Sequence, residues 1–146
     1  MKVLVTGATG FVGACLSRCL VEQGHEVHIF TRNTSNRWRI HDLTNRLKDC
    51  PVDLTNQEQV ENAVRKIQPE GIFHLATYGG FAEQRNTQTI ISANIMGTVN
   101  LLRACEQVGF EFFINTGSSS EYGFKSAPMR ETDEAAPIGD YGVSKL

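Results

Sequence analysis

The residues best suited to chemistry lie near the end of the chain, in the segment YGVSK. Tyr141 and Lys145 are four residues apart, which places both side chains on one face of a helix, one turn from each other. A free tyrosine ionises only near pH ~10, and a lysine cation one turn away favours the phenolate form. The pair could therefore remove a proton from a hydroxyl group, or return one, near neutral pH.

A glycine-rich turn near the start of the chain is a second candidate site. Gly7, Gly10 and Gly13 have the spacing G-x-x-G-x-x-G and stand between a short apolar run and a predicted helix. Glycines let the backbone approach a pyrophosphate closely, and the N–H groups of Phe11 and Val12 would be free to bind the anion. No Lys-Ser/Thr pair follows the last glycine, which excludes a P-loop. The turn therefore predicts dinucleotide binding.

The residues after the second predicted strand indicate which dinucleotide is bound. NAD enzymes usually carry an acidic residue here, which binds the ribose 2′-hydroxyl. Residues 30–33 read FTRN and contain no carboxylate. Arg32 could instead pair with the 2′-phosphate of NADP, helped by Arg37 or Arg39. We therefore expect NADP in preference to NAD.

The elements that must position these residues alternate between strand and helix. Strict alternation predicts an α/β fold, a doubly wound parallel sheet (Rossmann fold) that binds ligands at the carboxyl ends of its strands. On the fourth strand, His74 is flanked by apolar residues and is interpreted as structural. The predicted strands are residues 2–6, 26–31, 50–55, 71–77 and 111–118, and the predicted helices are residues 12–23, 57–67 (with Asn56 as N-cap) and a long one from Thr87 or Thr89 to 108.

Bulk properties narrow the class of protein. The 146 residues are expected to form one domain, residues 1–146, which binds NAD(P). A net charge of -2 argues against binding of nucleic acid or of an anionic membrane. The first apolar run is too short for a signal peptide or a membrane span, so we expect a cytoplasmic protein.

The four cysteines show no CxxC spacing, and no metal site is predicted. We expect them to be reduced and mostly buried. Cys15 and Cys19 lie one turn apart in the first predicted helix, on the same side as Leu16 and Leu20. That side is predicted to be the apolar face of the helix.

Six motifs in a fixed order resemble one known family. They are TGATGFVG, VDLT, IFHLAT, NIMGTVNLL, INTGSSSEYG and YGVSK, and together they extend over almost the whole chain. Each is weak alone, but in this order they resemble the extended branch of the short-chain dehydrogenase/reductase superfamily. That branch includes NAD(P)-dependent nucleotide-sugar epimerases, dehydratases and reductases.

The resemblance implies roles for several residues. Asp53 and Leu54 would face the adenine of the cofactor. Leu75, Ala76 and Thr77 would line the cofactor near its pyrophosphate and ribose.

It also implies the catalytic residues. Ser118 lies four residues before the tyrosine of EYG, where the family keeps its catalytic Ser or Thr, and would hold the substrate oxygen. Tyr141 and Lys145 match the family's YxxxK pair, with the tyrosine as acid and base. Asn94 matches an asparagine that supports the active-site lysine through water.

The reaction type stays open between three members of the family. Dehydratases place a glutamate just after the catalytic Thr, whereas here Ser119 and Ser120 follow, and Glu121 comes one place late. A dehydratase is therefore disfavoured, which leaves an epimerase or a reductase. The missing acidic residue after the second strand favours a 4-keto-6-deoxysugar reductase. A non-catalytic NAD(P)-binding module is the other class, although the three catalytic residues together favour an enzyme.

Family members continue for roughly as long again, with a small C-terminal domain that binds the substrate. A third hypothesis is that this chain is the cofactor-binding part of a longer architecture, homodimeric at full length, and has no activity by itself. The long helix carries an apolar face, with Ile90, Ile91, Ile95 and Leu102. In the family the matching helix helps to form the dimer, although packing against the chain's own sheet explains much of the same pattern. We expect the short helix at Tyr141 to be frayed or misplaced, because it has few residues to complete its hydrogen bonds.

Overall fold

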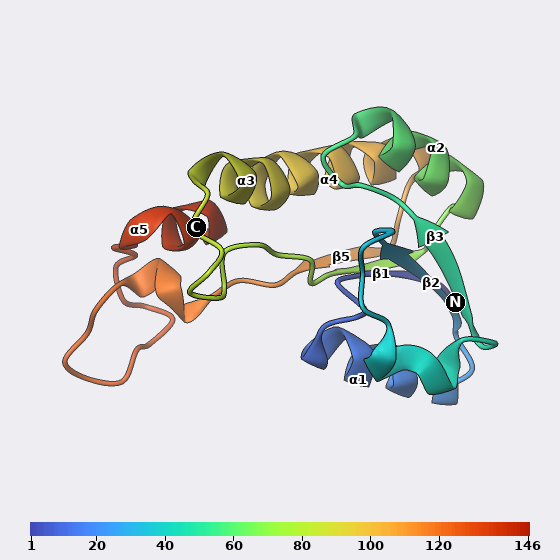
Figure 1. Cartoon of the computed structure of the whole chain (residues 1–146), viewed down its shortest axis with the longest axis horizontal. Helices are drawn as coiled ribbons and strands as arrows, with labels where there is room; N and C mark the ends of the chain where they lie inside the picture. The colour runs from blue at the N-terminus through green and yellow to red at the C-terminus, as the bar shows by residue number, and fades with distance from the viewer.

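Five parallel strands form one sheet at the centre of the structure, a computed structural model that describes residues 1–146 (Figure 1). Their order is β3-β2-β1-β4-β5, so the connections change direction between β1 and β4. In sheets of this kind ligands bind at that switch point. The predicted doubly wound fold is confirmed. The strands are β1 (Lys2–Thr6), β2 (Glu26–Thr31), β3 (Leu47–Pro51), β4 (Gly71–His74) and β5 (Phe112–Asn115).

Helices cover both faces of the sheet. Helix α1 and the 3₁₀ helix η1 lie on one face, and α2, α3 and α4 lie on the other (Figure 1). Because side chains alternate along a strand, Val3 and Val5 pack into the core beneath α1, whereas Leu4 packs into the core beneath α2 and α4. No helix has the length and apolar character needed to cross a membrane. The helices are α1 (Phe11–Glu22), η1 (Trp38–Leu43), α2 (Gln57–Ile67), α3 (Thr87–Ile91), the π-helical η2 (Ser92–Met96), α4 (Gly97–Val108), η3 (Ser119–Tyr122) and α5 (Gly139–Lys145).

The predicted cap of α2 is in place. The side chain of Asn56 accepts a hydrogen bond from the N–H of Gln59 and begins α2. The side chain of Asn86 accepts a hydrogen bond from the N–H of Thr89, and this cap fixes the start of the long helix at Thr87. The long helix then runs to Val108 as predicted, but it contains the π-helical turn η2, which the sequence did not reveal.

The third strand differs from its predicted position. It was expected at residues 50–55, but β3 runs from Leu47 to Pro51. β3 is an edge strand, and its residues Lys48 and Asp49 are exposed, paired with Glu26 and Arg37. Their charges interrupt the apolar pattern that marks a central strand.

The predicted apolar face of the first helix was only partly right, because Leu20 is buried and Leu16 packs against the core, but the two cysteines on that face are not buried. Cys15 and Cys19 are exposed, and of the other two cysteines only Cys105 is buried. The rotation of α1 is set by Gly13, because a Cβ there would lie 2.2 Å from the carbonyl oxygen of Gly7. With Gly13 turned inward, helical periodicity buries the positions around it, namely Ala14, Ser17, Leu20 and Val21.

The expectation that the last helix is frayed was also wrong. α5 is helical from Gly139 to Lys145 and lies beside α3 (Figure 1). The hydroxyl of Thr87 donates a hydrogen bond to the carboxylate of Asp140, and Gly142 is buried against the backbone of Ser120. These tertiary contacts stabilise a helix that is too short to be stable alone.

Candidate functional site

The glycine turn is shaped by two close backbone approaches. Gly7 has φ +71°, and a Cβ on it would lie 2.7 Å from the backbone of Leu75 and Ala76 at the end of β4. The N–H of Gly10 donates to the carbonyl of Gly7 over 3.0 Å, and Gly10 caps α1 without a side-chain hydrogen bond. The first N–H groups of α1 therefore remain free for an anion.

A cavity of about 600 Å³ opens in front of this turn, at the carboxyl ends of β1, β2 and β4. Its volume lies in the range of small-molecule sites. Gly13 packs behind Gly7, and Phe11 and Val12 are exposed on the first turn of α1, so these three do not line the cavity. The predicted cofactor residues that do line it are Gly7, Gly10, Arg32, Asp53, Leu54, Leu75, Ala76 and Thr77.

The loop after β3 is held in place on the wall of the cavity. Asp53 accepts hydrogen bonds from the N–H and the hydroxyl of Thr55, over 2.9 and 2.8 Å. The amide of Asn100 donates to the carbonyl of Leu54 over 2.9 Å, which ties the loop to α4. The glycine turn at Gly7 and Gly10, called the glycine cradle below, forms the opposite part of the site. Together with this preorganised loop it fits a dinucleotide.

Of the three arginines expected near a 2′-phosphate, only Arg32 lines the cavity. Arg37 is paired with Asp49 over 2.9 Å and donates to Thr31 over 2.7 Å. Arg39 instead stacks on the ring of Trp38, at 4.3 Å from its centroid. The expected help from Arg37 or Arg39 is therefore not seen, because both guanidinium groups already have partners.

His74 lies behind the site in a chain of buried hydrogen bonds. Its Nδ1 is 2.6 Å from the hydroxyl of Thr6, and its Nε2 is 2.9 Å from the hydroxyl of Thr98. Burial, and secondarily the charge of Lys145, lowers the pKa of His74 to about 4, so the ring is neutral at pH 7. These contacts agree with the structural interpretation of His74.

Asn94 stands in the π-helical turn and joins three elements. Its amide nitrogen donates to the carbonyl of Tyr78 and to the hydroxyl of Ser144, each over 2.8 Å. Its amide oxygen accepts from the N–H of Tyr78 and from the hydroxyl of Thr77. π-Helical turns are frequent at functional sites, and this one ties the loop after β4 to α5.

The elements that carry the three predicted catalytic residues pack against one another. Ser118 caps η3, its hydroxyl oxygen accepts from the N–H of Ser120, and its own N–H donates to Glu121 over 2.6 Å. Gly142 of α5 lies so close to η3 that a Cβ would stand 2.7 Å from the carbonyl oxygen of Ser120. Burial lowers the pKa of Lys145, and the nearby carboxylate of Glu121 opposes that shift.

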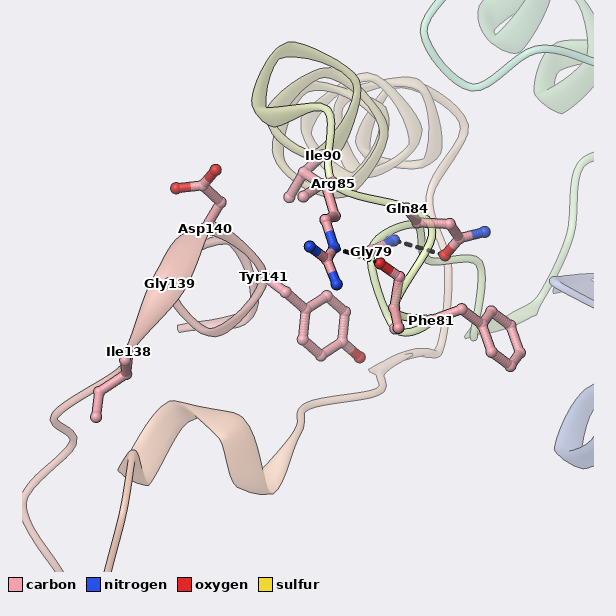
Figure 2. A pocket seen from close by; sticks show the side chains of 11 residues that line it. Gly79, Phe81, Gln84, Arg85, Ile90, Ile138, Gly139, Asp140 and Tyr141 are labelled. Atoms are coloured by element: carbon pink, nitrogen blue, oxygen red, sulfur yellow. Dashed lines mark hydrogen bonds between the residues drawn. The ribbon is translucent and has the colours of Figure 1, made fainter.

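Tyr141 faces a second cavity, of about 350 Å³, shown in Figure 2. Its ring lies against Gly79, where a Cβ would be 3.2 Å from the ring and 2.9 Å from Ile90. Phe81 and Gln84 line both cavities, so the space in front of Tyr141 adjoins the space in front of the glycine turn.

The sequence had pointed to the loop after β4 only as a segment. Its individual side chains were not predicted. The principle that ligands bind at the carboxyl ends of parallel strands identifies the loops of a site, but it does not tell which side chains of a loop face the ligand. The lining residues missed in this way are Tyr78, Phe81 and Gln84, and Thr9 and Ser35 were missed in other loops.

Residues 3–146 match the NAD-dependent epimerase/dehydratase family. The chain belongs to this family. It is 40% identical over 124 residues to a 3-beta-hydroxysteroid dehydrogenase of Mycolicibacterium neoaurum, an alignment that covers 82% of this chain and 32% of that protein. It is 31% identical over 159 residues to a GDP-mannose 4,6-dehydratase of Yersinia enterocolitica, covering 99% of this chain and 43% of that protein.

The fold is shared with solved structures of the family. The UDP-glucose 4-epimerase of Thermus thermophilus, solved in complex with NAD, superposes with a TM-score of 0.86 at 30% identity. The match covers 99% of this chain and 47% of the epimerase. The chain spans about a third to a half of the length of the relatives it matches. The names of these relatives refer to a steroid and to a nucleotide sugar as substrates. Membership of the family therefore does not determine the substrate of this chain.

Proposed function

We propose that this chain forms the NAD(P)-binding part of an oxidoreductase or epimerase that acts on a nucleotide-linked sugar. The observation that carries the proposal is the adjoining pair of cavities, which share Phe81 and Gln84. One is backed by a glycine cradle that suits a dinucleotide, and the other is faced by Tyr141. A cofactor and the hydroxyl of a substrate could therefore meet next to Tyr141.

NAD(P), when bound, accepts a hydride from the substrate carbon or returns it. Tyr141 would take the proton of the sugar hydroxyl in the oxidative direction and give it back in the reductive direction. Lys145, a cation one turn away, would stabilise the negative charge left on the Tyr141 oxygen. The hydroxyl of Ser118 accepts a hydrogen bond from Ser120 and donates to no protein group, so its proton can hold the substrate oxygen.

Two reactions fit this proposal: epimerisation, and reduction of a 4-keto-6-deoxysugar. A dehydratase is less favoured, because the carboxylate of Glu121 accepts a hydrogen bond from the N–H of Ser118 through one oxygen and is thereby held against the backbone of η3. Arg32 on the cavity wall supports NADP over NAD as the cofactor.

We further propose a homodimer for the longer protein. Apolar side chains stay exposed on the side of the long helix and on α5, among them Ile91, Ile95, Met96 and Val143. Ile90, which was expected on this surface, is buried within the chain, and Leu102 is half-buried. Light scattering on the longer protein tests the proposal, and a monomer contradicts it.

Two measurements test the proposed function. Fluorescence titration of the chain with NADPH and NADH should show binding of both, and absence of binding would contradict the proposal. The longer protein is then assayed on 4-keto and 4-hydroxy nucleotide sugars, with a 3-hydroxysteroid as a further substrate. Tyr141→Phe should abolish turnover and leave cofactor binding intact, while Tyr122→Phe, the matched change on η3, should leave both intact. Cofactor binding without any Tyr141-dependent turnover supports a non-catalytic module.

A further inference from the structure

The cavity in front of Tyr141 carries one cation that has no acidic partner. Its wall is formed by residues 79–82, 84 and 85 of the loop after β4, by Ile90 and by the start of α5. Arg85 is exposed and takes part in none of the four ion pairs of the structure. The cavity therefore presents an unpaired guanidinium group beside the residue proposed to transfer the proton.

The guanidinium of Arg85 is partly held in place. Its Nε donates to the carbonyl of Ala82 over 2.6 Å, and its two terminal nitrogens donate to no protein group. Figure 2 shows this group next to the ring of Tyr141, between the loop and α5. The parallel N–H groups of a guanidinium bind both oxygens of a carboxylate or phosphate at once, and a partly fixed one loses less entropy on binding.

The other polar groups on the wall do not neutralise Arg85. Asp140 accepts a hydrogen bond from the hydroxyl of Thr87, and its carboxylate points away from Tyr141 in Figure 2. The side-chain oxygen of Gln84 is bound to the N–H of Gly79 over 2.8 Å. The remaining lining is largely apolar or glycine. A ligand must therefore bring the negative charge.

We propose that Arg85 binds a carboxylate carried by the reacting sugar, so that the substrate is a nucleotide-linked uronic acid. This inference rests on the proposed function, because it places the sugar ring in the cavity that Tyr141 faces. In a nucleotide-linked uronic acid the carboxylate is carried on C5, next to the C4 hydroxyl, whereas the diphosphate is carried on the anomeric oxygen across the ring. Arg85 and Tyr141 line the same small cavity, so the anion that Arg85 binds should be the one next to the reacting hydroxyl. This argues for a ring carboxylate and against the diphosphate, and it favours epimerisation over reduction of a 6-deoxysugar, whose C6 is a methyl group.

The test uses two sugars that differ only in the charged group. Methyl β-D-glucuronide and methyl β-D-glucoside are titrated into the chain saturated with NADH, and binding is followed by amide chemical shifts. We expect the glucuronide to bind roughly three- to tenfold more tightly. Arg85→Gln should remove this preference, while Arg103→Gln, which removes the same charge from an exposed site on α4, should keep it.

Three outcomes contradict the proposal: equal binding of both sugars, a preference that survives Arg85→Gln, and no detectable binding of the glucuronide. Amide spectra of the variants show whether they are folded. The readout is independent of turnover. If the sugar preference is absent while NADH binds and Tyr141-dependent turnover occurs, only the inference about Arg85 fails. If NADH binding or turnover is absent, the proposed function itself fails.

Discussion

The side-chain amide of Asn94 lies 2.8 Å from the hydroxyl of Ser144, and this hydrogen bond joins the π-helical turn to α5. The hydroxyl of Ser144 in turn donates to the carbonyl of Tyr141 over 2.8 Å. Asn94 also binds the backbone of Tyr78 through both of its polar atoms. The helix that carries Tyr141 and Lys145 is thus held in register with the loop that follows β4.

Removal of the Ser144 hydroxyl should loosen α5. Ser144→Ala leaves one N–H of Asn94 without a partner and should cost about 1 kcal/mol of local stability. Amide hydrogen exchange of Gly142 to Lys145 should become faster, with little change in the sheet. Ser119→Ala, on the neighbouring η3, is the control, because no hydrogen bond of its hydroxyl is present. Unchanged exchange in α5 would show that other contacts hold the helix.

Alanine at Gly13 should damage the glycine turn more than alanine at Gly10. A Cβ at position 13 would lie 2.2 Å from the carbonyl oxygen of Gly7, whereas at position 10 the distance to the same atom is 3.3 Å. Overpacking at Gly13 should cost about 2–3 kcal/mol and weaken NADH binding, while Gly10→Ala should cost less. Urea unfolding and fluorescence titration measure the two effects. Equal effects of the two substitutions would contradict the geometry.

Arg32 and Arg37 should differ in their effect on cofactor choice. Arg32→Ala removes the one arginine on the cavity wall and should weaken NADPH binding roughly tenfold while leaving NADH binding nearly unchanged. Arg37→Ala breaks the pair with Asp49 and should lower the stability of the β2–β3 edge without changing the ratio of the two affinities. If Arg32→Ala weakens NADPH and NADH equally, the proposed preference for NADP is wrong.

Acid should destabilise the fold through His74. Its pKa is about 4 in the folded chain, against 6.5 for the free side chain, so between these pH values the unfolded chain holds a proton that the folded chain lacks. The free energy of unfolding should therefore fall as pH decreases from about 6.5 to 4, by up to about 3 kcal/mol.

The control for this pH dependence is His74→Gln, measured by urea unfolding at each pH. The variant should be less stable than the wild type at pH 7, because the bonds to Thr6 and Thr98 are disturbed. It should lose the decline between pH 6.5 and 4. Glu26, whose pKa is lowered to about 2 mainly by its hydrogen bond with Lys48, titrates alike in both proteins. Parallel curves for the two proteins would exclude His74 as the cause.

The sequence by itself determined the features that depend on local physics. The order of strands and helices follows from apolar runs and periodicity, and Asn56 marks the start of α2 because its side chain satisfies a nearby N–H. The glycine spacing predicted the cradle, since only residues without a Cβ fit where backbones approach so closely. The six ordered motifs indicated the family to which the chain belongs.

Tertiary structure decided what depends on partners distant in the chain. The pairing of Arg37 with Asp49 withdrew one expected ligand from the cavity, and contact between Gly13 and Gly7 turned Cys15 outward. The short helix α5 is ordered because Asn94 and other distant residues bind it. Such contacts join residues whose separation carries no pattern in the sequence, so local propensity cannot reveal them. For the same reason, the place of Arg85 next to Tyr141 became visible only in the folded chain.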